Sequence, residues 1–124
     1  MSDLTKKEYQ VMLSFYELNK NLSKNELLEM VPNLNGNTVG VVLSRLLKKG
    51  YLEVSEVIQT RTALARVYRP CVSFSTFLIN EIGIVKVDAL IKKSIDSIDD
   101  LQELRKLSIR INEAKEKLTL FEKI

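Results

Sequence analysis

The chain contains no histidine, no tryptophan and a single cysteine, Cys71. Histidine is the commonest general base near neutral pH, so its absence excludes Ser–His and Cys–His nucleophiles. One cysteine without histidine also excludes a zinc finger within one subunit and an internal disulfide. A lone free thiol is typical of a reducing compartment. We therefore expect no catalytic residue, no metal site and no cofactor.

Long apolar runs are also missing. No stretch approaches the roughly 18 residues of a membrane span, and the opening residues, MSDLTKKEYQ, lack the hydrophobic segment of a secretory signal. We expect a cytoplasmic protein without a membrane partner. Apolar residues make up 45% and charged residues 28% of the chain, which is ordinary usage for a folded protein.

Positive charge is concentrated in the middle of the chain. The whole sequence carries a net charge of +3, and the segments on either side of residues 35–70 are close to neutral. The acidic residues of that segment are Glu53 and Glu56, and its basic residues are Arg45, Lys48, Lys49, Arg61, Arg66 and Arg69. One basic segment in a nearly neutral chain indicates a polyanion bound at that segment.

Capping signals predict three helices in the first half of the chain. Thr5 and Ser23 are each followed three positions later by a glutamate, which is the capping box that starts a helix. Pro32 ends the second helix, Asn35 caps the third, and Gly50 ends the third. The side chains expected to face the core along the third helix are Val39, Val42, Leu43, Leu46 and Leu47.

From Tyr51 to Pro70 the pattern is that of extended structure. Two apolar runs flank a polar tip that contains Arg61, which predicts a two-stranded hairpin with a positively charged end. Three helices followed by a hairpin within about 70 residues is the order of a winged helix-turn-helix.

After residue 73 the pattern is helical again. Two short apolar segments lie on either side of Gly83, and a longer helix is expected to start near Ser97, with Asp100 in its first turn. The a and d positions of nearly three heptads in this helix are Leu104, Leu107, Ile111, Ala114, Leu118 and Phe121. We expect this seam to pair two copies of the chain, although the same residues would also suit packing on their own winged helix.

The segments NGNTVGVVLSRLLKKGYLEV and VYRPCVS resemble the penicillinase repressor family, the BlaI/MecI/CopY type of bacterial winged-helix regulators. The resemblance covers the chain in layout and is most specific in these two segments. It implies homodimers that bind operator DNA of dyad symmetry, with the C-terminal helices as the dimer interface.

The sequence also departs from that family in three places. Gly40 and Val41 stand early in the third helix, where members carry polar or basic residues. The paired Cys-x-Cys motifs of the copper-responsive branch and the Asn-Phe cleavage site of the antibiotic-responsive branch are absent. The inducing signal of either branch is therefore not carried over to this chain.

Together these patterns predict a mainly α (α+β) fold. We expect a winged helix-turn-helix DNA-binding domain over residues 1–72 and a helical dimerisation arm over residues 73–124. The expected function is that of a sequence-specific transcriptional regulator, a repressor that binds double-stranded DNA as a homodimer, and not that of an enzyme.

The candidate DNA contacts lie on the third helix, opposite its apolar stripe, and at the hairpin tip. Val41 suits a thymine methyl group, although a single exposed valine is also ordinary on a protein surface. Basic side chains such as Arg45 and Arg61 suit phosphates. The predicted set is Asn37, Thr38, Val41, Ser44, Arg45, Lys48 and Arg61.

Two other interpretations stay open. In the first, the winged helix is a protein-interaction module, and Gly40 and Val41 mark a lost DNA surface. In the second, a small molecule binds between the winged helix and the arm, which is compatible with DNA binding but has no residue signature.

Overall fold

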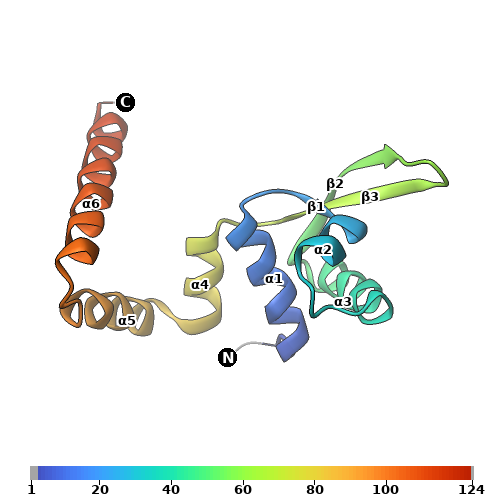
Figure 1. The fold of residues 1–124 in the computed structure, drawn as a ribbon, viewed down its shortest axis with the longest axis horizontal. Coiled ribbons are helices and arrows are strands. Elements are labelled where there is room, and N and C mark those ends of the chain that lie inside the picture. The colour runs from blue at the N-terminus through green and yellow to red at the C-terminus, as the bar shows by residue number, and fades with distance from the viewer. Residues whose placement is uncertain (1–2, 124) are drawn as a thin grey trace. The chain divides into compact units, whose positions relative to one another are not determined.

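A computed structural model describes residues 3–123 of the chain, which divides into two compact units at Gly83 (Figure 1). The first unit holds α1 (Lys6–Leu18), β1 (Leu22–Ser23), α2 (Lys24–Met30), α3 (Gly36–Lys49), β2 (Leu52–Gln59), β3 (Leu64–Pro70) and α4 (Phe74–Ile82), and the second holds α5 (Ile84–Asp96) and α6 (Leu101–Glu122). This element order is a winged helix-turn-helix followed by further helices, so the predicted fold class is confirmed.

Both predicted capping boxes form at the starts of α1 and α2. The Glu8 backbone N–H donates to Thr5 Oγ1 at 3.2 Å, and the Thr5 N–H donates to Glu8 Oε1 at 2.8 Å. Ser23 and Glu26 exchange the same pair of hydrogen bonds at 3.2 and 3.1 Å. These reciprocal bonds satisfy N–H groups that the first helical turn leaves without partners.

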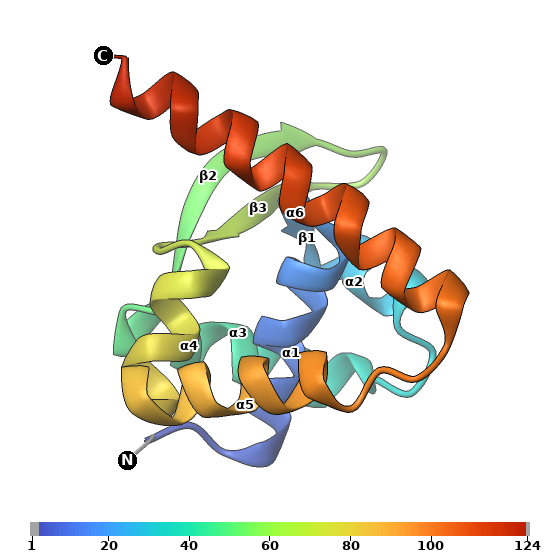
Figure 2. The same cartoon turned by 90° about the vertical axis from the view of Figure 1, so that its left-hand side faces the viewer.

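The sheet has three strands in the order β1-β3-β2, whereas the sequence predicted only the hairpin of β2 and β3. The added strand β1 pairs antiparallel with β3, with Leu22 opposite Tyr68. Two residues are too few to show a strand period, so this pairing is decided by tertiary contact. It places the start of α2 beside the hairpin, which projects away from the three helices (Figure 1 and Figure 2).

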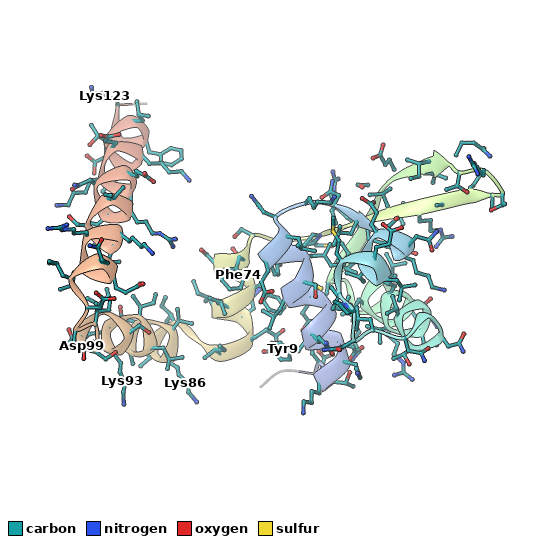
Figure 3. The ribbon with its side chains drawn as sticks, viewed as in Figure 1. Tyr9, Phe74, Lys86, Lys93, Asp99 and Lys123 are labelled. Atoms are coloured by element: carbon teal, nitrogen blue, oxygen red, sulfur yellow. The ribbon has the colours of Figure 1, made fainter. Side chains whose placement is uncertain are left out.

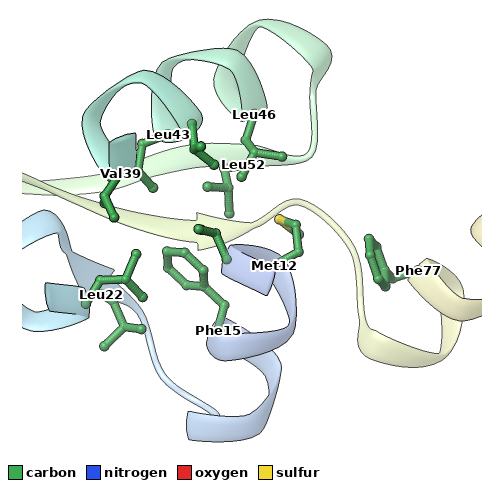
Figure 4. Packing of buried hydrophobic residues seen from close by; sticks show 11 residues of the cluster. Met12, Phe15, Leu22, Val39, Leu43, Leu46, Leu52 and Phe77 are labelled. Atoms are coloured by element: carbon green, nitrogen blue, oxygen red, sulfur yellow. The ribbon is translucent and has the colours of Figure 1, made fainter. Parts of the chain in front are cut away.

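The core of the first unit is built from apolar side chains of α1, α3 and the shorter elements around them (Figure 4). Its buried members are Val11, Met12, Phe15, Leu22, Leu27, Val39, Val42, Leu43, Leu46, Leu52 and Phe77. Four of the five predicted core positions of α3 belong to it, and the fifth, Leu47, is partly buried against it. The expected inner face of α3 is therefore confirmed.

Helix α4 belongs to the first unit because Phe77 is 1% exposed and completes this core. The centre of the Phe77 ring lies 5.8 Å from the ring centre of Tyr9 and 5.2 Å from that of Tyr16, and both tyrosines are on α1. Figure 3 shows the aromatic side chains of α1 and α4, with Tyr9 and Phe74 labelled. The boundary between the two compact units therefore lies after residue 83. The domain boundary that the sequence indicated lies after residue 72.

The second unit consists of α5 and α6, and neither helix has a buried residue. Asp100 is the N-cap of α6, where its Oδ1 accepts the Gln102 N–H at 3.0 Å. The helix therefore begins at Leu101, later than the start near Ser97 that we expected, because Asp100 and not Ser97 is its N-cap. The Ser97 hydroxyl donates to the Ser94 carbonyl in the last turn of α5. Charged side chains, among them Lys86, Lys93 and Asp99, project from this unit (Figure 3).

None of the helices within residues 3–123 combines the length and the apolar character needed to span a bilayer.

Candidate nucleic-acid interface

The outer face of α3 is exposed along its whole length. Val41 stands in its middle with 51% of its surface exposed. The predicted contact residues that the structure brings together on this face, all exposed, are Asn37, Thr38, Val41, Ser44, Arg45 and Lys48. The seventh predicted residue, Arg61, lies apart from them at the exposed tip of the hairpin.

Shallow hollows lie on both sides of a ridge formed by Val41 and Arg45. The hollow on one side is lined by Lys24, Asn37, Gly40, Val41, Ser44, Arg45 and Lys48. The hollow on the other side is lined by Thr5, Lys7, Asn37, Thr38, Val41, Val42 and Arg45. A helix that stands out as a ridge between two hollows suits insertion into the major groove, which admits one α-helix.

A third hollow links this face to the hairpin. Its lining includes Ser23 and Lys24 at the start of α2 and Leu64, Arg66 and Tyr68 on β3. Strand β1 holds these two segments together, because it precedes α2 directly and pairs with β3. Lys24 therefore borders both α3 and the hairpin.

Ion pairs separate the basic residues of this region into two groups. Lys49 lies 2.8 Å from Glu8, and Arg69 lies 2.7 Å from Glu53, so both charges are compensated within the chain. Within residues 3–123, no carboxylate forms an ion pair with the remaining cations that border α3 or lie on the hairpin, which are Lys7, Lys24, Arg45, Lys48, Arg61 and Arg66. These uncompensated charges are the ones available to an external anion.

A compact turn holds the hairpin tip. Thr60 accepts the Ala63 N–H on its Oγ1 at 3.2 Å, and the Thr60 backbone N–H donates to the Ala63 carbonyl at 2.8 Å. These bonds pair the backbone groups of Thr60 and Ala63 on either side of the turn. Arg61 and Thr62 between them remain exposed to solvent.

Sequence reasoning did not assign Lys24 or Lys7 to this surface. Each lies on a different helix from the predicted recognition face, and the periodicity of one helix says nothing about its neighbours. The one signal in the sequence was Gly40, a glycine in the interior of a helix, which can mark a place where another group approaches closely.

The described part of the chain, residues 3–123, holds no cluster of three or more histidine, cysteine, aspartate or glutamate side chains able to bind a metal. The surface is thus described by cations, amides and hydroxyls on one helix, with one apolar side chain among them. This composition suits the backbone and base edges of a nucleic acid.

Comparison with solved structures supports the fold. The chain is similar to a mutant of MepR from a multidrug resistant S. aureus clinical isolate, with a TM-score of 0.51 and 15% identity, over 94% of this chain and 80% of that chain. Streptococcus pneumoniae FabT in complex with DNA aligns with a TM-score of 0.48 and 16% identity, over 94% of this chain and 77% of that chain. No curated protein shows significant similarity to the sequence.

The sequence profile described as penicillinase repressor matches residues 4–108, which include the whole winged helix, α4, α5 and the first turns of α6. This match covers far more than half of the chain and confirms the resemblance carried by α3 and the hairpin. The chain therefore belongs to the penicillinase repressor family, and it is a DNA-binding transcription regulator and not an enzyme.

Proposed function

We propose that this regulator is a cytoplasmic repressor that binds a dyad-symmetric operator as a homodimer, with the winged helix as the DNA-binding domain and the C-terminal helices as the dimerisation arm. The single observation that carries the proposal is the outer face of α3. Its six predicted contact side chains are exposed, and its cations have no internal partner within residues 3–123, whereas Lys49 and Arg69 are paired.

In this proposal α3 enters the major groove, and Asn37, Val41 and Ser44 face the base edges. Val41 is the central apolar group of the ridge, and a thymine methyl is the apolar feature that the major groove offers. Amide and hydroxyl side chains on either side are suited to hydrogen bonds with bases. This arrangement would make the interface selective for sequence.

The remaining contacts are assigned to the DNA backbone. Thr38, Arg45 and Lys48 flank the base-reading residues on α3, and Arg61 is placed at the hairpin tip. Phosphate contacts fix the orientation of the protein and supply affinity that decreases with salt, without reading sequence.

The dimer is proposed from the surface of α6. Its heptad seam is exposed except at Leu107, which is half-buried, with Ile111 at 41%, Leu118 at 56% and Phe121 at 63%. A row of exposed apolar side chains on one helix favours burial against a partner. A second copy would bury the same seam by symmetry. Two winged helices related by a twofold axis would then contact half-sites about one helical turn apart.

The test uses the full-length protein and duplex DNA taken from upstream of its own gene. We expect a protected footprint with twofold symmetry, and an affinity that falls steeply as salt is raised, with a slope of about −0.9 for each phosphate neutralised. If the winged helix is instead a protein-interaction module, duplex affinity stays weak at every salt concentration. That result would refute the proposal.

A further inference from the structure

Gly40 is an unexpected residue in the interior of α3. Within residues 3–123 the glycines with positive φ are Gly50 and Gly83, so Gly40 has ordinary helical backbone geometry that any residue could adopt. Glycine in a helix interior is destabilising relative to alanine, because glycine loses more conformational freedom than alanine when the chain folds. Backbone geometry thus gives no reason for glycine at this position.

The space beside Gly40 is occupied by the side chain of Lys24. A Cβ atom at position 40 would lie 3.3 Å from Lys24 Nζ and 3.7 Å from Lys24 Cε. Lys24 is the first residue of α2, so its side chain crosses from that helix to the outer face of α3. The missing side chain at position 40 therefore lets the ammonium group lie close against the α3 backbone.

Cations and neutral residues of the described part of the chain line the hollow beside this ammonium group. Lys24 lines the same hollow as Arg45 and Lys48, and no carboxylate contributes to that lining. Within residues 3–123, Lys24 also forms no ion pair. Three cations around one hollow repel each other, and an anion bound among them would offset this repulsion.

We propose that Lys24 and the glycine notch at Gly40 form a binding site for one phosphodiester group of the DNA backbone. The notch positions the Lys24 ammonium group over α3, and Lys24 neutralises the phosphate next to the bases that α3 contacts. The site rests on the proposed DNA-binding function and adds to it a contact from α2.

A double-mutant cycle tests the site. Lys24→Met keeps the unbranched side chain and removes the charge, and Gly40→Ala fills the notch. The affinity of each variant for the footprinted duplex and for an unrelated duplex is measured by fluorescence anisotropy over a series of salt concentrations. Thermal melts check that each variant folds.

Lys24→Met should weaken binding to both duplexes alike, by about 5- to 10-fold, and reduce the salt slope by about 0.9. Gly40→Ala should raise the melting temperature, because alanine is the better helix former. It should yet weaken binding by about 3-fold, since its Cβ, 3.3 Å from Nζ, makes the ammonium group shift away from α3 by a few tenths of an ångström. In the Lys24→Met background, Gly40→Ala should cause no further loss.

Lys20→Met is the matched control. Lys20 has the same charge but pairs with Glu26 at 3.3 Å, so its removal should change affinity by less than about 2-fold. Equal losses for Lys20→Met and Lys24→Met would refute the site, as would an equal effect of Gly40→Ala in both backgrounds. Wild-type protein without duplex affinity refutes the proposed function itself, whereas wild-type binding with an unchanged Lys24→Met variant refutes only this site.

Discussion

At the scale of single residues, the side chains of α3 serve different purposes. Lys49 at the C-terminal end donates to Glu8 Oε1 and to the Asp3 carbonyl, each at 2.8 Å, and so ties α3 to the start of α1. Val41, nearer the N-terminal end, contacts solvent over half of its surface. A positive charge in this region therefore does not by itself make a side chain available to DNA, because Lys49 is engaged within the chain. The apolar Val41, by contrast, is accessible.

Val41→Asp should abolish specific DNA binding. The carboxylate would replace the apolar group proposed to contact a thymine methyl, and it would face the phosphates with a like charge, so we expect at least about 2 kcal/mol of lost binding energy. The thermal melt should stay nearly unchanged, because position 41 is exposed. Val41→Thr keeps one methyl group and serves as the matched control, with a small loss expected. Unchanged operator affinity for Val41→Asp would remove α3 from the interface.

The titration of Glu8 should make the free energy of unfolding depend on pH. Burial by itself would raise the pKa of this carboxyl, but hydrogen bonds from Lys49 and from the Thr5 backbone, together with the Lys49 charge, outweigh burial and hold the pKa below its usual value of 4.5. A folded pKa below the unfolded one means that the stabilisation is present above the unfolded pKa and is lost as pH falls through the folded pKa. The free energy of unfolding should therefore decrease as pH falls below about 4.5.

Urea unfolding at a series of pH values measures this dependence. In Glu8→Gln the decrease should be smaller, because the group that titrates is gone, and the protein should be less stable at neutral pH, because Lys49 has lost its partner. Glu29→Gln changes an exposed glutamate of α2 and is the control. Identical acid dependence in wild type and Glu8→Gln would show that another group dominates.

At the scale of elements, hydrogen bonds from two tyrosines fasten α4 to the winged helix. Tyr51, directly after α3, donates to Glu81 Oε1 at 2.6 Å, and Tyr9 of α1 donates to Glu81 Oε2 at 3.4 Å. Burial, followed by the hydrogen bonds with Glu81 and Asp3, raises the pKa of Tyr51, which keeps its hydroxyl protonated as a donor. Glu81 is in the last turn of α4, so these bonds hold the helix at the end where the first unit stops.

Tyr51→Phe should lower the free energy of unfolding by about 1 kcal/mol, because the substitution removes hydrogen bonds to a charged acceptor while the ring stays against Phe77. Chemical denaturation of the full-length protein measures the change. Tyr68→Phe, on β3, removes a hydroxyl for which the structure gives no hydrogen bond within residues 3–123 and should have a smaller effect. Equal stability of wild type and Tyr51→Phe would mean that Glu81 does not hold α4 in place.

At the scale of the whole molecule, the proposed function needs two copies of the chain. The first unit has a core of its own, whereas α5 and α6 bury no residue and expose many apolar ones. A helix gains most of its stability from packing an apolar face, so these two helices favour association. The seam of α6 is the part of this surface with a heptad repeat.

Ile111→Asp should convert the protein from a dimer to a monomer in sedimentation at micromolar concentration. The substitution places a charge in the centre of the seam, and burying that charge without a partner would cost several kcal/mol. Operator affinity should fall by at least about 10-fold, because one winged helix contacts one half-site. Ile109→Asp alters an exposed isoleucine outside the seam and should leave the dimer intact. A wild-type protein that sediments as a monomer would refute the proposed assembly.

The sequence by itself determined the helices, the hairpin and the inner face of α3. Each depends on signals within a few residues of one another, such as the glutamate three positions after Thr5 or the helical spacing of Val39, Val42 and Leu46. Those signals act through local hydrogen bonds and through one helix period. The same reasoning identified the exposed side of α3, since it is the side opposite the apolar stripe.

Only the tertiary structure decided which charges are compensated and which elements meet. Strand β1, the attachment of α4 through Phe77, and the crossing of Lys24 over Gly40 all join residues that are far apart in sequence. The pairing of Lys49 with Glu8 likewise depends on packing, and that of Arg69 with Glu53 depends on the register of the hairpin. A local sequence pattern does not predict such contacts. They stabilise the protein only once the chain has folded and brought the partners within a few ångströms.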